Sequence, residues 1–139
     1  MNKYLLDVYN PFKVEFLYGK GSTLFDKKGN DYIDFTSGIG VSCLGHGNKK
    51  LVETISKQAK KFLHLSNIYP INTQEECAKK VAALSGYKNM QGFFCNSGAE
   101  ANETAIKFIR KYAKSKGIKK HNIITLENSF HGRTIATLN

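Results

Sequence analysis

A Ser-Gly-Ala-Glu sequence at residues 97–100 has the residue types that hold an anion at the start of a helix. Ser97 and Glu100 have the spacing of a capping box, in which each side chain satisfies a backbone amide of the first helical turn. Gly98 and Ala99 are small, so an anion could approach the remaining free amides. The pattern predicts a phosphate seat, although well-capped helices that bind nothing share it.

A second group of candidate residues lies at 129–134, with the sequence Ser-Phe-His-Gly-Arg-Thr. Phe130 offers an aromatic face, and Arg133 offers a planar guanidinium that suits a carboxylate. His131 could exchange a proton near neutral pH, but a hydrogen bond within its own loop is the favoured interpretation. Together with the phosphate seat, these residues suit a phosphorylated aromatic ring and a substrate that carries a carboxylate.

The elements that must position both groups form a predicted βαβ unit over residues 92–127. Short apolar segments at 92–95 and 122–126 are typical of buried strands, and the helix between them ends near Gly117. Because parallel strands end at the same edge of a sheet, we expect residues 97–100 and 129–134 to lie close together there.

The N-terminal part of the chain predicts a hairpin, a loop and a helix. Strands are expected at 22–25 and 31–35, around a turn that contains Asp and Gly. Residues 37–47 form a loop so rich in glycine that its backbone could adopt positive φ and approach a ligand closely. Asn48 is the predicted N-cap of the next helix.

A further helix is predicted from the capping-box sequence Thr73-Gln-Glu-Glu to Gly86. The fold class is therefore α/β. Residues 1–70 are expected to form the hairpin, glycine loop and helix segment, and residues 71–139 the start of a larger α/β domain.

Charge distribution and missing motifs argue against nucleic-acid and nucleotide binding. The 139 residues carry 21 basic and 11 acidic side chains, but 19 of the cations are lysines spread along the chain. Nucleic-acid binding usually needs a concentrated basic stripe, so a solvated surface is the favoured interpretation. Neither a Walker loop nor a dinucleotide fingerprint occurs.

Cysteine usage and hydropathy indicate a cytoplasmic protein. Cys43, Cys77 and Cys95 form no C-x-x-C pair, which argues against a disulfide framework and against a metal site. No apolar stretch is long enough to span a membrane, and no secretory signal is recognisable, so we expect no membrane association.

Four stretches of this sequence resemble one family. Asp-Lys-Lys-Gly-Asn-Asp-Tyr-Ile-Asp-Phe-Thr-Ser-Gly-Ile-Gly-Val at 26–41, Leu-Gly-His at 44–46, Phe-Cys-Asn-Ser-Gly-Ala-Glu-Ala-Asn-Glu at 94–103 and Glu-Asn-Ser-Phe-His-Gly-Arg-Thr at 127–134 stand in the family's order. The chain resembles the class III pyridoxal-phosphate-dependent aminotransferases of fold type I, closest to the acetylornithine aminotransferases. The resemblance implies the N-terminal portion of that fold.

The resemblance also implies roles for single residues. Ser97, Gly98 and Ala99 would bind the phosphate of pyridoxal 5'-phosphate, Phe130 would stack on its pyridine ring, and Arg133 would bind a substrate carboxylate. The family transfers amino groups between small amino acids and 2-oxo acids through a Schiff base, and it forms homodimers. For the acetylornithine branch, the implied reaction is transfer from N-acetylornithine to 2-oxoglutarate in arginine biosynthesis.

Ile39 and His131 bear on the choice of substrate. Ornithine aminotransferases usually carry tyrosine and tryptophan at these positions, so the chain is more similar to the branch with acetylated substrates. An apolar Ile39 offers no polar partner to a substrate amine. Ornithine and succinyl-diaminopimelate-type substrates stay open as alternatives.

The resemblance implies no catalytic residue within these 139 residues. The Schiff-base lysine, and the aspartate that keeps the pyridinium protonated, are expected beyond Asn139. We therefore expect an N-terminal portion that is inactive alone. The other hypotheses are a non-catalytic basic module for phosphate or nucleic acid, and a degenerate relative with a regulatory role.

Overall fold

The computed structural model describes residues 4–120 and 122–138. The chain divides into two compact units between Ser66 and Asn67, and each unit is described by itself. The domain boundary expected at residue 70 concerns the fold of a larger protein, and it stays a prediction.

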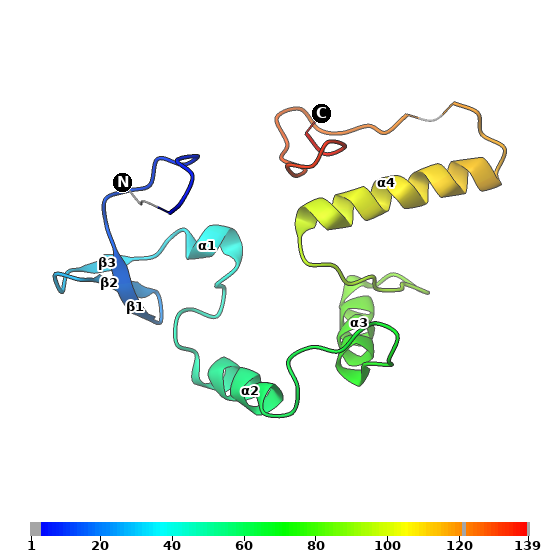
Figure 1. Cartoon of the computed structure of the whole chain (residues 1–139). Helices are drawn as coiled ribbons and strands as arrows, with labels where there is room; N and C mark the ends of the chain where they lie inside the picture. Colours follow the sequence, from blue (N-terminus) through cyan, green and yellow to red (C-terminus); the bar gives the residue numbers. More distant parts are fainter. Residues whose placement is uncertain (1–3, 121, 139) are drawn as a thin grey trace. The chain divides into compact units, whose positions relative to one another are not determined.

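The first unit begins with a three-stranded antiparallel sheet in the order β1-β2-β3 (Figure 1). Its strands are β1 (Phe16–Lys20), β2 (Thr23–Asp26) and β3 (Asp31–Ile33). The predicted hairpin is present as β2 and β3, with bounds that differ by one or two residues. The sequence analysis did not predict β1, which pairs with β2 from Phe16 opposite Asp26 to Lys20 opposite Thr23.

Asp26 fixes the turn between β2 and β3. Its carboxylate accepts hydrogen bonds from the backbone amides of Lys28 and Asn30, from the Asn30 side chain and from the Tyr32 hydroxyl. These bonds, above all the one from the Asn30 side chain, hold the pKa of Asp26 below its ordinary value. The carboxylate thus belongs to the structure of the hairpin.

A short turn, α1 (Ser37–Gly40), and the helix α2 (Lys49–Ala59) complete the first unit. The Asn48 side chain accepts a hydrogen bond from the Leu51 amide at 3.1 Å, so the predicted N-cap of α2 is confirmed.

The second unit contains α3 (Asn72–Ser85) and α4 (Gly98–Ser115). The capping box predicted at Thr73 is wrong, because the N-cap of α3 is Ile71, two residues earlier, which is extended and makes no side-chain cap. The predicted end of α3 is confirmed by Gly86, whose φ of 72° gives the left-handed conformation that terminates helices.

The strands predicted at 92–95 and 122–126 are also wrong for the described residues. Neither segment forms a strand, and β1-β2-β3 is the one sheet found in residues 4–120 and 122–138. Parallel pairs are stable inside sheets that are covered on both faces, and two segments beside a single helix do not supply that cover. The βαβ ladder is therefore absent, while the helix predicted between the two segments is present as α4.

Few side chains are buried in either unit. Ala113 is the one buried apolar residue among the described positions, and Phe93, Phe108 and Tyr112 are more than half exposed. Hydrogen-bond networks around buried or half-buried polar groups hold the local structure instead. The arrangement leaves apolar faces that are typical of surfaces covered by further protein.

Candidate functional site

Ser97 caps α4 as the sequence predicts. Its hydroxyl accepts a hydrogen bond from the Glu100 amide at 3.2 Å, and the Glu100 carboxylate accepts one from the Asn96 amide at 2.6 Å. The first bond is the N-cap bond of a capping box, and the second reaches the amide one residue before the N-cap; together they fix where the helix begins.

The first amides of α4 are available to an anion. Gly98 and Ala99 occupy the first turn, where amides have no acceptor within the helix. A Cβ atom added at Gly98 would meet no atom within 4 Å, so the space beside this residue is open. Small residues, unbonded amides and the positive end of a helix together fit a phosphate group.

The chain returns along α4 after the helix ends, and the loop that carries Phe130 and Arg133 docks near the start of the helix (Figure 1). The Asn102 side chain donates a hydrogen bond to the His131 carbonyl oxygen at 2.6 Å. The Thr134 hydroxyl donates one to the Glu103 carboxylate. These bonds bring the two predicted groups of residues together through the helix, without the parallel strands that the sequence analysis expected to do so.

Gly132 makes the closest backbone approach. It is buried, with φ at 138°, and a Cβ atom there would lie 2.8 Å from the Ala99 Cβ atom and 2.5 Å from the Thr137 hydroxyl oxygen. Thr137 is buried too, and its hydroxyl accepts a hydrogen bond from the Thr134 amide. Only glycine fits between the loop and the first turn of α4.

Phe130 and Arg133 lie against each other. The guanidinium carbon of Arg133 is 5.7 Å from the centre of the Phe130 ring, a cation–π distance. The ring is 78% exposed, so it has room for a further planar partner. The loop therefore presents an aromatic face and a positive fork side by side.

His131 makes the local contact that the sequence analysis favoured. Its Nδ1 atom lies 2.9 Å from the Ser129 carbonyl oxygen, so this nitrogen carries the proton and donates it to the carbonyl. Together with the Asn102 bond to its own carbonyl, this contact makes His131 part of the docked loop.

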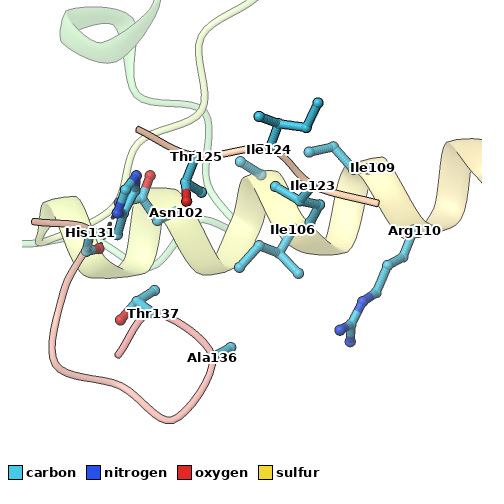
Figure 2. A pocket seen from close by; sticks show the side chains of 11 residues that line it. Asn102, Ile106, Ile109, Arg110, Ile123, Ile124, Thr125, His131, Ala136 and Thr137 are labelled. Atoms are coloured by element: carbon cyan, nitrogen blue, oxygen red, sulfur yellow. Dashed lines mark hydrogen bonds between the residues drawn. The ribbon is translucent and has the colours of Figure 1, made fainter. Parts of the chain in front are cut away.

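A groove of about 450 Å³ lies between α4 and the segment at 123–125 (Figure 2). Figure 2 shows Ile123 beside Ile106 and Ile109, whereas Ile124 points away. None of the residues with predicted binding roles lines this groove. The groove is mostly apolar, and it borders the candidate site through Asn102, His131 and Thr137, which hold the docked loop.

Ile39 belongs to the first unit and is 96% exposed. Its backbone has φ at 62°, a conformation that is rare for a β-branched residue. No position relative to Ser97, Phe130 or Arg133 is assigned to Ile39, so its predicted substrate contact stays a prediction.

The sequence reasoning missed the residues that hold the loops. Asn102 and Glu103 act across about thirty residues of chain, and no local pattern reveals such pairs. Thr137 bonds Thr134 within the second loop itself. Asp34 was also missed. Aspartate side chains often accept hydrogen bonds from backbone amides two or three residues later, as Asp34 does from Thr36 and Ser37.

Cysteines, acidic clusters and helix hydropathy in the described part of the chain bear on metal, disulfide and membrane sites. Cys43, Cys77 and Cys95 are free thiols. Residues 4–120 and 122–138 contain no group of three acidic, histidine or cysteine side chains placed to hold a metal ion. The described helices include none with the length and apolar character needed to cross a bilayer.

The fold and the capped helix define a class of protein, and comparison with known proteins identifies it. Residues 7–139 match the aminotransferase class-III family. The chain belongs to this pyridoxal-phosphate-dependent family, and its fold is the N-terminal part of the family's α/β fold.

Among individual relatives, the acetylornithine aminotransferase of Wolinella succinogenes is 53% identical over 138 residues, covering 98% of this chain and 35% of the relative. The structure of N-acetylornithine aminotransferase from Stenotrophomonas maltophilia K279a matches with a TM-score of 0.80 and 40% identity, over 88% of this chain and 34% of that one. An ornithine aminotransferase from Toxoplasma gondii, with pyridoxal phosphate at partial occupancy, matches with a TM-score of 0.84 and 27% identity, over 96% and 32% of the two chains. This chain thus spans about a third of the length of the proteins it matches.

Proposed function

We propose that the full-length protein containing these residues transfers the amino group of N-acetylornithine to 2-oxoglutarate, as a step of arginine biosynthesis. The observation that carries the proposal is the docking of residues 130–134 on the open, capped start of α4. The identity of 53% to an acetylornithine aminotransferase supports this choice of substrate.

Pyridoxal phosphate, when bound, supplies the electron sink for the reaction. In this proposal Gly98 and Ala99 donate their free amides to its phosphate, and Ser97 holds those amides in place by capping the helix. Phe130 presents its exposed ring to the plane of the cofactor. Each residue binds or orients, and none of them transfers a proton.

Arg133 is the proposed partner of a substrate carboxylate. Its guanidinium can bond both carboxylate oxygens at once, which a lysine cannot do with the same geometry. The stacking of Arg133 on Phe130 restrains the fork before a substrate arrives. Such preorganisation lowers the entropy lost on binding.

The acyl group of the donor distinguishes the candidate substrates, and ornithine is the second candidate because an ornithine aminotransferase is among the matched structures. Ile39 favours the acylated donor, since an exposed apolar side chain offers nothing to a charged amine. A succinylated donor would need a further cationic group.

The proposal includes a cytoplasmic homodimer that binds neither nucleic acid nor membranes. The family resemblance supports the dimer, and the three free thiols support a reducing compartment. The cofactor's lysine and the aspartate for its pyridine nitrogen are proposed to lie beyond Asn139.

One experiment tests the core of the proposal. The full-length protein is incubated with pyridoxal phosphate, reduced with borohydride and analysed by intact mass and peptide mapping, and amino transfer to 2-oxoglutarate is measured in parallel. We expect one cofactor on one lysine beyond residue 139, and faster turnover with N-acetylornithine than with ornithine or a succinylated donor. Scattered labelling of surface lysines without turnover would refute the proposal.

The salt dependence of ligand binding distinguishes the aminotransferase proposal from the hypothesis of a basic binding module. Binding of nucleic acid would weaken steeply as salt is added, whereas cofactor binding that depends on stacking should persist and be lost in Phe130→Ala.

A further inference from the structure

The glycine loop begins with a left-handed turn. Ser37, Gly38, Ile39 and Gly40 have φ values of 46°, 62°, 62° and 77°. Glycine adopts such values freely, but Ser37 and the β-branched Ile39 do so only under strain. Strained residues persist where neighbouring groups hold them, so the contacts around this turn bear on its purpose.

Asp34 holds the start of the turn. One oxygen of its carboxylate accepts hydrogen bonds from the Thr36 hydroxyl at 2.8 Å, the Thr36 amide at 3.1 Å and the Ser37 amide at 2.8 Å. The side chain is only 6% exposed. These bonds fix the backbone at the residue where the positive φ values begin.

His46 holds the other end of the loop. Its Nε2 atom lies 2.8 Å from the second oxygen of Asp34. Its backbone exchanges two hydrogen bonds with Gly21, at 2.9 and 2.7 Å. A single carboxylate therefore ties together the two ends of the loop and the edge of the sheet.

The imidazole ring of His46 packs against the backbone of Gly19. A Cβ atom at Gly19 would lie 2.5 Å from the ring's Cγ atom, and one at Gly45 would lie 2.8 Å from the Gly21 carbonyl oxygen. Glycine at both positions lets the histidine lie directly on the end of β1. Ile39 stands near the start of this loop, and its side chain is 96% exposed.

We propose that the Asp34–His46 pair is a positioning device, which holds the left-handed turn so that Ile39 is presented to the amino donor. The proposal rests on the proposed function, because it takes Ile39 as a contact of the donor's acyl side chain. Asp34 and His46 touch no substrate in this scheme. They act by making one strained conformation of the loop the populated one.

The test uses the full-length protein with Asp34→Asn, His46→Ala and His46→Gln. Matched controls are Asp31→Asn, an exposed carboxylate of β3, and His64→Gln, an exposed histidine after α2. Two quantities are measured for each variant: amide hydrogen exchange in the peptides that span residues 36–42, and KM and kcat for N-acetylornithine and for 2-oxoglutarate separately.

If the pair positions the loop, Asp34→Asn and His46→Ala should speed exchange at residues 36–42 about tenfold, as expected for the loss of a charge-assisted hydrogen bond. KM for N-acetylornithine should rise about three- to tenfold, while kcat and KM for 2-oxoglutarate change less than about twofold. His46→Gln should restore most of the loss, because its amide nitrogen can replace Nε2. Gly19→Ala, which displaces the ring but keeps both partners, should act in the same direction.

Unchanged exchange and unchanged KM in Asp34→Asn and His46→Ala would overturn the proposal. The proposal would also be overturned if kcat fell as much as kcat/KM for both substrates while the protein lost stability. That result would mean that the pair only supports the fold. A wild-type protein without amino transfer from any acylated donor would refute the proposed function instead, and hydrogen exchange would still decide whether the pair holds the turn.

Discussion

Asn102 donates a hydrogen bond from its side-chain amide to the carbonyl oxygen of His131 at 2.6 Å, across 29 positions of chain. The donor stands on the second turn of α4, and the acceptor stands between Phe130 and Arg133. This bond joins the helix whose first amides have no acceptor within the helix to the loop that offers a ring and a cation.

Replacing Asn102 by alanine should release the loop. The half-buried His131 carbonyl would lose its partner, at a cost of about 1–2 kcal/mol in the free energy of unfolding. In the full-length protein we expect weaker binding of pyridoxal phosphate, measured by fluorescence titration. Asn102→Asp keeps the shape of the side chain but removes the N–H donor, so it should bind the cofactor as weakly as Asn102→Ala. Asn122→Ala, at an exposed asparagine, should bind the cofactor as wild type does. Equal cofactor affinity in all four proteins would contradict this role.

A side chain at Gly132 should be among the costliest changes in the second unit. In Gly132→Ala the new Cβ atom would overlap Thr137 and Ala99, so the loop must move away from α4. We expect a loss of more than about 2 kcal/mol in the free energy of unfolding, measured by denaturant titration of the full-length protein.

Gly86→Ala is the matched control for that change. Gly86 also has a positive φ, at 72°, but a Cβ atom there meets nothing within 4 Å. The control should cost only about 1 kcal/mol, the strain of a left-handed alanine. A similar loss for both variants would show that backbone conformation, and not the contact with Ala99, determines the result.

Local signals in the sequence located the helix ends well. Ser97, Asn48 and Gly86 act within three or four residues of themselves, so their residue types were enough to place them. The N-cap predicted at Thr73 lies two positions after the observed N-cap, Ile71, because the local pattern does not say which residue of Ile71, Asn72 and Thr73 leaves the extended conformation first.

Contacts between residues far apart in the sequence could not be predicted from local sequence patterns. The strand β1 contains Gly19 and lacks a clear alternation, and it exists because it pairs with β2. The apolar runs at 92–95 and 122–126 have strand composition but lack a partner in the described residues. The convergence of the two candidate groups was predicted for the wrong reason, since side chains of α4, and not a sheet edge, dock the second loop.

Acid should weaken the first unit. Hydrogen bonds from His46, Thr36 and Ser37, with the His46 bond the largest cause, lower the pKa of Asp34 from 3.8 to about 2. A carboxylate with a lowered pKa stabilises the folded state fully above its unfolded value, and this contribution is lost as the pH falls from near 3.8 to about 2. Asp26 should add to the effect, because its pKa is also lowered.

Denaturant midpoints of wild type and variants between pH 2 and 6 would measure this dependence. Asp34→Asn should flatten the acid limb of the stability curve, and Asp31→Asn should leave it unchanged. If Asp34→Asn has the same acid limb as wild type, the pKa of Asp34 is not lowered in the folded protein, and the effect assigned to its hydrogen bonds is refuted.

The two arginines of the chain allow a direct test of carboxylate binding. Arg133→Lys keeps the charge but loses the planar fork and weakens the stacking on Phe130. In the full-length protein we expect KM for 2-oxoglutarate to rise about tenfold or more, because a bidentate pair becomes a single contact. Arg110→Lys changes the same residue type in the apolar groove along α4 and should leave KM within about twofold. If both variants raise KM equally, the cause is the stability of α4. If neither does, another cation binds the carboxylate, and Arg133 serves only to support the ring of Phe130.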